Sequence, residues 1–391
     1  MKQTWNQHVV RKENKSLVLT TVKEHSPISR ADVAQLTGLN KGTVSSLVSE
    51  LISENLISES GPGQSSGGRR PVMLLFNQLA GYAIGLDLGV NYLLGMLTDL
   101  NGNVIFEKKV ELLDTKYEKI SDTIFTAIDD LLRVAPQSPY GVIGIGVAVP
   151  GIVSNEGKIL FAPNLGWREV DLKSLLETKY QLPVVIENEA NAGAYGEKMY
   201  GTGKTAETII YVSIGIGIGV GLILDGVLYK GKSGLSGELG HMTIERNGLK
   251  CSCGNEGCWE LYASEQALLK KAEKLDVKTE SGDPISLDDL NHLANQGHKD
   301  SINLLYEIGD HIGIGINNII NTFNPELIII GNRIASCEQW VKPSLEKRIK
   351  SDSLPFHQDD VTLNFSELKT HSSALGIVAF VTEKFLMVDP N

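Results

Sequence analysis

Apolar residues in the first 60 positions recur at helical spacing in three short segments separated by turn residues. The pattern predicts helices over Asn14–His25, over Ser29–Thr37 with Ser29 as the N-cap, and from about Lys41 onward. Gly38 supplies the turn between the second and third helices, and the third has one apolar face, formed by Val44, Leu47, Val48 and Leu51. A helix, a short glycine-containing turn and a second helix form the helix-turn-helix pattern.

The polar residues at the start of the third helix are candidate DNA contacts. In this motif the second helix lies in the major groove, with its N-terminal residues toward the base edges. An ordinary solvated helix start is the alternative for each residue taken singly. The predicted contacts are Lys41, Thr43, Ser45 and Ser46, together with Arg30 at the start of the preceding helix.

Two short strands follow the three helices and enclose a tip rich in glycine and serine. The strands begin at Ile57 and Val72, and the tip between them ends in Arg69 and Arg70. A β-hairpin in this position is a wing, and its arginines suit the negative potential of a narrow minor groove. A polar interdomain linker is the alternative, and the two interpretations are compatible.

From Tyr82 onward the pattern changes to short apolar strands that alternate with amphipathic helices. One cycle begins at residue 83, and a second begins at 208 and returns to a strand at 327–331. This repetition predicts an internal duplication, with two α/β lobes around a cleft at the carboxyl ends of their strands. The expected domains are a winged helix-turn-helix at residues 1–75, a first lobe at 76–195 and a second lobe at 196–391.

Charge is divided unevenly between these parts. Residues 1–75 hold nine Lys/Arg and six Asp/Glu, a net charge of +3. The remainder of the chain has a net charge of −14, which gives −11 for the whole chain. A weakly basic head on an acidic body fits a nucleic-acid module joined to a larger unit. No apolar run reaches the ~20 residues of a membrane span, and the first residues carry no secretory signal. We therefore expect a cytoplasmic protein that does not enter a membrane.

Three of the four cysteines lie within eight residues, as Cys251, Cys253 and Cys258. Soft thiolates select zinc in an intracellular protein, and His241, ten residues upstream, is the expected fourth ligand. A closed Cys3His site is structural rather than catalytic. A reactive dithiol is the alternative, and the separate Cys337 is expected to act as a small apolar residue.

Four motifs together resemble the ROK family of repressors and sugar kinases, which has an actin-like, two-lobed sugar-kinase fold. They are Val147-Ala148-Val149-Pro150-Gly151, Glu187-Asn188-Glu189-Ala190-Asn191, Gly237-Glu238-Leu239-Gly240-His241 and the segment from Cys251 to Glu260. The resemblance covers the chain from about residue 80 to its end. It implies sugar contacts at Asn188, Glu189, Glu238, His241 and Glu260, and also at Asn164.

The resemblance to the kinases of the family weakens on the nucleotide side. Glu189 stands where kinases have an aspartate base, and the longer side chain displaces the carboxylate. Val90 and Ile216 replace glycine and threonine of the two phosphate loops, and Asn332 replaces a glycine near adenosine. The sequence therefore predicts a protein that binds no nucleotide and is not an enzyme, with an ATP-dependent sugar kinase as the alternative.

With its head, the chain resembles the repressor branch of the family, and most of all the xylose-responsive members found in Gram-positive bacteria. This resemblance implies a homodimer on a palindromic operator, released by D-xylose, with glucose as a possible competitor. Residue types do not separate a pentose from a hexose, so glucose or an N-acetylhexosamine as the effector stays open.

Overall fold

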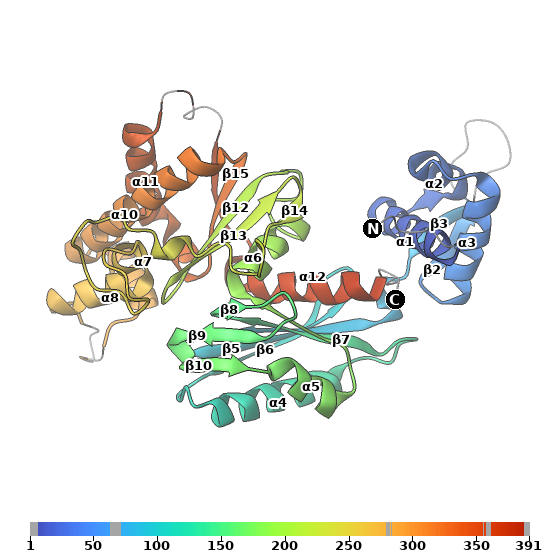
Figure 1. Cartoon of the computed structure of the whole chain (residues 1–391), viewed down its shortest axis with the longest axis horizontal. Helices are drawn as coiled ribbons and strands as arrows, with labels where there is room; N and C mark the ends of the chain where they lie inside the picture. The colour runs from blue at the N-terminus through green and yellow to red at the C-terminus, as the bar shows by residue number, and fades with distance from the viewer. Residues whose placement is uncertain are drawn as a thin grey trace.

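The computed structural model describes residues 7–62, 72–278, 282, 284–354, 356 and 361–386. The N-terminal head lies to one side of the two lobes of the body (Figure 1). It contains three helices and a three-stranded sheet of order β1-β3-β2. Its elements are α1 (Gln7–His25), β1 (Ile28–Ser29), α2 (Arg30–Thr37), α3 (Lys41–Ser53), β2 (Ile57–Pro62) and β3 (Val72–Phe76).

The helix boundaries of the head follow from local capping. The Ser29 side chain accepts from the Asp32 amide, and Gly38 ends α2 with a φ of 71°, a conformation that glycine adopts without strain. Asn40, which the sequence analysis did not single out, caps α3 by accepting from the Thr43 amide. The predicted apolar face of α3 is buried, whereas α1 begins earlier than expected, at Gln7.

The first lobe is built on a five-stranded sheet of order β11-β7-β4-β5-β6. Strands β11, β7 and β4 are parallel, and β5 and β6 extend the sheet as an antiparallel hairpin. Three short strands form a separate sheet beside it. The elements are β4 (Tyr82–Leu88), β5 (Tyr92–Asp99), β6 (Val104–Glu111), α4 (Tyr117–Val134), β7 (Val142–Val149), β8 (Ile152–Val153), β9 (Ile159–Ala162), β10 (Trp167–Val170), α5 (Leu172–Tyr180), β11 (Val184–Asn188) and α6 (Glu189–Met199).

The second lobe repeats this topology. Its sheet of order β14-β13-β12-β15-β16 has three parallel strands and an antiparallel extension, and so matches the first sheet strand for strand. The predicted two-lobed, duplicated α/β fold is therefore confirmed. The elements are β12 (Ile209–Ile214), β13 (Ile218–Leu224), β14 (Val227–Leu228), α7 (Glu260–Ala263), α8 (Glu265–Lys274), α9 (Leu287–Asn295), α10 (Lys299–Phe323), β15 (Leu327–Gly331), α11 (Glu338–Asp352) and β16 (Thr362–Phe365).

The last helix, α12 (Ser372–Leu386), returns to the first lobe. It packs on β4, β7 and α6, and it lies between the two lobes with its end beside the head (Figure 1). The predicted boundary at residue 195 assigns α12 to the second lobe. Because α12 packs on elements of the first lobe, we propose that it belongs structurally with that lobe. No helix among the described residues is both long and apolar enough to cross a bilayer.

The glycine-rich run at residues 215–221 serves two purposes. Gly215-Ile216-Gly217 forms the turn between β12 and β13, whereas Gly219 and Gly221 lie within β13. A Cβ on Gly221 would stand 2.3 Å from the carbonyl oxygen of Ala190 in α6. The later glycines therefore allow α6 to lie against the strand, which is the packing role that glycine repeats also suit.

Candidate functional site

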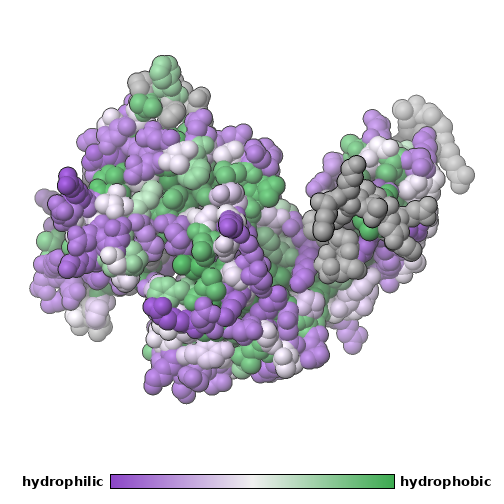
Figure 2. Space-filling view, in the orientation of Figure 1, coloured by the Kyte–Doolittle hydropathy of each residue, from purple (hydrophilic) through white to green (hydrophobic). Residues whose placement is uncertain are grey.

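A cleft of about 840 Å³ lies between the lobes, a volume within the range of about 300–1,000 Å³ that small-ligand sites usually have. Figure 2 shows hydrophobic surface gathered where the lobes meet, while hydrophilic residues dominate the outer faces in this view. The fold brings all six predicted sugar contacts to the wall of this cleft. They are Asn164, Asn188, Glu189, Glu238, His241 and Glu260.

Asn188 ends β11 and caps α6. Its Oδ1 accepts from the amides of Ala190 (2.8 Å) and Asn191 (3.1 Å), and its Nδ2 donates to the carbonyl oxygen of Gly151 (2.8 Å). These bonds fix the orientation of the amide. The helix cap and the predicted ligand contact therefore fall on the same side chain.

Glu189 turns toward the second lobe. Its Oε1 accepts from the hydroxyl of Ser213 (2.7 Å) and from Nδ2 of Asn332 (2.8 Å), and the same Nδ2 lies 3.0 Å from the Ser213 hydroxyl. Burial raises the pKa of Glu189. Ser213 was not among the predicted residues, and Asn332 had been noted only as a departure from the kinase pattern.

The loop after β4 is filled by a tyrosine ring. Tyr92 donates its hydroxyl to Asp87 Oδ2 at 2.7 Å, and a Cβ on Gly89 would lie 2.2 Å from the Tyr92 ring. Burial raises the pKa of Asp87 well above its usual range, and the charge of Glu189 adds to the shift. The Tyr92 ring therefore packs directly on the backbone of this loop.

The predicted metal ligands form one compact cluster, in which the donor atoms all lie within 4.8 Å of one another. Cys251 Sγ is 3.6 Å from His241 Nδ1, and Cys253 Sγ is 3.7 Å from Cys258 Sγ. Tetrahedral zinc, with bonds of about 2.3 Å to sulfur and about 2.0 Å to nitrogen, gives donor–donor distances of about 3.5 Å between sulfur and nitrogen and about 3.8 Å between two sulfurs. The donor set and its spacing therefore fit zinc.

His241 connects this cluster to the cleft. Its Nδ1 faces the Cys251 thiol and lies 3.4 Å from Glu260 Oε1, while its Nε2 lies 3.9 Å from Glu238 Oε2. Burial raises the pKa of Glu238. Nδ1 of the His241 ring is thus directed to the cysteine cluster, and Nε2 is directed to Glu238.

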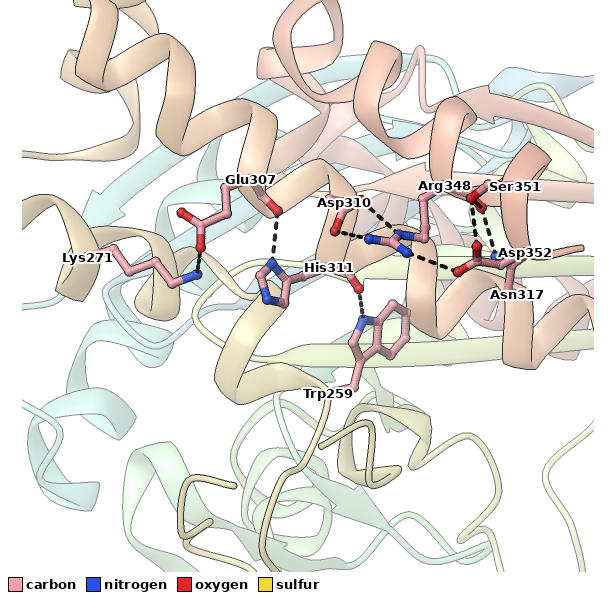
Figure 3. Close-up of polar contacts among 9 residues, drawn as sticks. All are labelled: Trp259, Lys271, Glu307, Asp310, His311, Asn317, Arg348, Ser351 and Asp352. Atoms are coloured by element: carbon pink, nitrogen blue, oxygen red, sulfur yellow. Dashed lines mark hydrogen bonds and ion pairs between the residues drawn. The ribbon is translucent and has the colours of Figure 1, made fainter. Parts of the chain in front are cut away.

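Trp259, between Cys258 and Glu260, anchors the cysteine loop to the core of the second lobe. Its side chain is fully buried, and its Nε1 donates to the carbonyl oxygen of His311 in α10 at 2.9 Å (Figure 3). A Cβ on Gly315 would lie 2.0 Å from the indole ring, so the tryptophan rests directly on the helix backbone. This anchor is not predicted by any pattern in the sequence.

Helix α10 is connected in turn to α11 by an ion pair between Asp310 and Arg348. Arg348 of α11 donates through Nε and Nη2 to the two carboxylate oxygens of Asp310, at 2.8 and 2.6 Å (Figure 3). Such bidentate pairs combine charge with fixed geometry. The support for the cysteine loop therefore extends through α10 to α11.

The predicted DNA contacts that the structure describes come from α2 and α3 of the head. Lys41, Ser45 and Ser46 are exposed along the first turns of α3, and Thr43 is half-buried. Arg30 donates to Glu59 Oε1 of β2 at 2.7 Å, which ties α2 to the first strand of the wing. Arg69 and Arg70 lie outside the described residues, so their predicted role stays a prediction.

These features define a two-lobed α/β protein with a cleft between the lobes, a Cys3His cluster beside the cleft that could hold a metal ion, and a helix-turn-helix head. The model of the ROK family matches residues 83–384. The chain belongs to the ROK family.

A curated relative and a solved regulator match nearly the whole chain, whereas a solved kinase matches 77% of it. A xylose repressor of Bacillus spizizenii is 49% identical over 97% of this chain and 98% of its own length. The crystal structure of a ROK family transcriptional regulator, a homologue of the Escherichia coli MLC protein, superposes with a TM-score of 0.82 at 28% identity, covering 97% of this chain and 98% of the other. A ROK family glucokinase from Streptomyces griseus, in complex with glucose and AMPPNP, gives 0.70 at 27% identity, covering 77% and 99%.

Proposed function

We propose that this chain is a sugar-responsive transcriptional repressor and not an enzyme. The observation that carries this function is the division of the cleft into two unlike ends. On one side, Glu238, His241 and Glu260 converge beside the metal cluster. On the other, Glu189 is bonded to Ser213 and Asn332. The head supplies the DNA-binding module, as in the full-length repressors that the chain resembles.

Bonds to the second lobe engage one of the two oxygens of the Glu189 carboxylate, Oε1. A general base must lie within hydrogen-bond reach of the proton that it removes. Both bonds to Oε1 of Glu189 hold that oxygen toward the second lobe. Tyr92 occupies the neighbouring loop. These contacts favour a sugar that is bound over a sugar that is phosphorylated.

We propose D-xylose as the effector, in line with the xylose repressors at 40–49% identity. Glucose, which has the same ring with an added hydroxymethyl group, is the proposed competitor. The carboxylates of Glu238 and Glu260 would accept from sugar hydroxyls, and Nε2 of His241 would donate to one, since buried hydroxyls need partners. Asn164 and Asn188 would contribute amide groups from the first lobe.

Zinc is the proposed resident metal, held by His241, Cys251, Cys253 and Cys258. When bound, zinc supplies a fixed centre that sets the orientation of the His241 ring. The Trp259 anchor then transfers that fixed position to α10. A site with four protein ligands is closed, so its proposed role is structural.

On DNA, we propose that a homodimer binds a palindromic operator through α3 and the wing, because two-fold operators match two-fold proteins. D-xylose would change the angle between the lobes and move the two heads out of register with the half-sites. Inverting a 1:99 population would require a difference of about 5.5 kcal/mol in sugar affinity between the two states.

Thermal melting of the full chain with single ligands tests the proposed ligand class. A ligand at about 100 times its dissociation constant adds about 2.7 kcal/mol of stability, which moves the melting temperature by a few degrees. We expect D-xylose to raise it and Mg-ATP to leave it unchanged, with D-glucose and N-acetylglucosamine as comparison sugars. A shift with Mg-ATP would contradict the proposal, and a shift with another sugar alone would reassign the effector.

A further inference from the structure

Glu189 has a second set of contacts, through its main chain. Its carbonyl oxygen accepts from the hydroxyl of Ser373, in the first turn of α12, at 3.1 Å. Its side chain meanwhile bonds to Ser213 and Asn332 of the second lobe. One residue at the start of α6 therefore touches both the second lobe and α12.

The helices α6 and α12 are in backbone contact near this point. A Cβ on Gly376 of α12 would stand 1.7 Å from the carbonyl oxygen of Ala192, and one on Gly196 of α6 would stand 2.1 Å from that of Ser372. No side chain separates the two helices there. Close-packed interiors transmit displacement rather than absorb it, so movement at the start of α6 carries over to α12.

The other end of α12 contacts the head. Val378, Val381 and Leu386 belong to the same apolar cluster as the core residues of the head. The Phe385 ring lies 5.0 Å from that of Tyr140, edge to face, and the Tyr140 hydroxyl donates to the carbonyl oxygen of Glu54 in the head at 2.9 Å. Figure 1 shows α12 extending from between the lobes to the head.

We propose that Glu189, Ser213 and Asn332 form a junction that couples the angle between the lobes to the position of the head, through Ser373 and α12. Glu189, at the position where a kinase has its base, would thus link the second lobe to α12. Ser213 and Asn332 act as positioning residues, because the proposed link from them to α12 passes through Glu189. This inference rests on the proposed repressor function.

A second contact between the lobes lies beside the junction. Lys230 Nζ, from the second lobe, is 2.7 Å from Glu187 Oε2, and Glu187 Oε1 accepts from the amide of Asn188. This ion pair also ties the start of α6 to the second lobe. The junction differs from this ion pair in that Glu189, rather than Glu187, bonds onward to α12; farther along α6, Glu197 accepts from Ser372 of α12.

The test compares Ser213→Ala with Ser344→Ala in the full chain. Both serines are buried in the second lobe, but Ser344 donates only to the carbonyl oxygen of Val341 in its own helix. The measurements are the affinity for D-xylose and the affinity for a DNA fragment that the chain selects from a random pool. Loss of one hydrogen bond of about 1 kcal/mol shifts a two-state equilibrium about fivefold.

We expect Ser213→Ala to change the two affinities in opposite directions, by up to about fivefold, because a shift between two states favours one ligand at the expense of the other. Asn332→Gly should do the same, since it removes the amide at a φ of 63° that glycine tolerates. Ser344→Ala should change neither affinity. If both affinities stay unchanged in Ser213→Ala, or both weaken, the junction is refuted.

Hydrogen exchange without sugar or DNA separates the junction from the proposed function. Ser213→Ala should exchange faster than the wild type in the first turn of α12 and in α1, and Ser344→Ala should not. Equal exchange in all three proteins would overturn the junction. If D-xylose leaves the DNA affinity of the wild-type chain unchanged, the proposed effector is wrong. The difference in hydrogen exchange would still support the junction in that case.

Discussion

Replacing Cys258 with alanine is expected to remove zinc from the chain and to abolish measurable sugar binding. Changes outside the ligand set already lower metal affinity by about 10–100-fold, so loss of one of four ligands should exceed that range. Without the metal, the His241 ring and the cysteine loop lose their common anchor, and Glu260 follows that loop directly. Zinc per chain by elemental analysis and D-xylose titration by calorimetry give the two readouts.

Cys337→Ala is the matched control for this substitution. Both cysteines are fully buried, but Cys337 lies before α11, away from the metal cluster. The control should retain one zinc per chain and the wild-type sugar affinity. A Cys258→Ala protein that keeps one zinc and binds D-xylose normally would show that the Cys3His assignment is wrong.

The second large effect is expected from Trp259→Ala. Removing a fully buried tryptophan costs about 3–5 kcal/mol of unfolding free energy, through lost burial and the cavity that remains. The bond to the His311 carbonyl is lost as well. Urea unfolding followed by circular dichroism measures the change, with the zinc content of the folded protein as a second readout.

Trp340→Ala provides the comparison. Trp340 is half-buried on α11, and its Nε1 donates to Asn295 Oδ1 at 3.1 Å, away from the cysteine loop. It should cost less than half as much as Trp259→Ala and leave the zinc content unchanged. Equal losses of stability in the two variants, with equal zinc retention, would contradict the anchoring role of Trp259.

Much of the fold follows from periodicity in the sequence. The three helices of the head, the strands of the wing and the two strand-helix cycles have spacings that local physics fixes. The return of α12 to the first lobe does not follow in this way. Its segment is apolar on nearly every side, which indicates burial but not which lobe covers it.

The candidate site shows the same division between local and long-range information. The cysteine spacing predicted a cluster that the fold does assemble, because three ligands lie in one short loop. The direction of Glu189 could not be predicted, since its partners Ser213 and Asn332 are 24 and 143 residues away in sequence. Trp259 likewise reaches His311 over 52 residues.

In the proposed repressor, a sugar bound between the lobes changes the affinity of the head for DNA. The most direct test is an equilibrium titration of the full chain against a DNA fragment that it selects from a random pool, with and without saturating D-xylose. Coupling between two sites is typically about 5–150-fold. We predict that D-xylose weakens DNA binding within that range and that Mg-ATP has no effect. If D-xylose leaves the affinity for this DNA fragment unchanged, the proposed sugar-responsive repressor function is wrong.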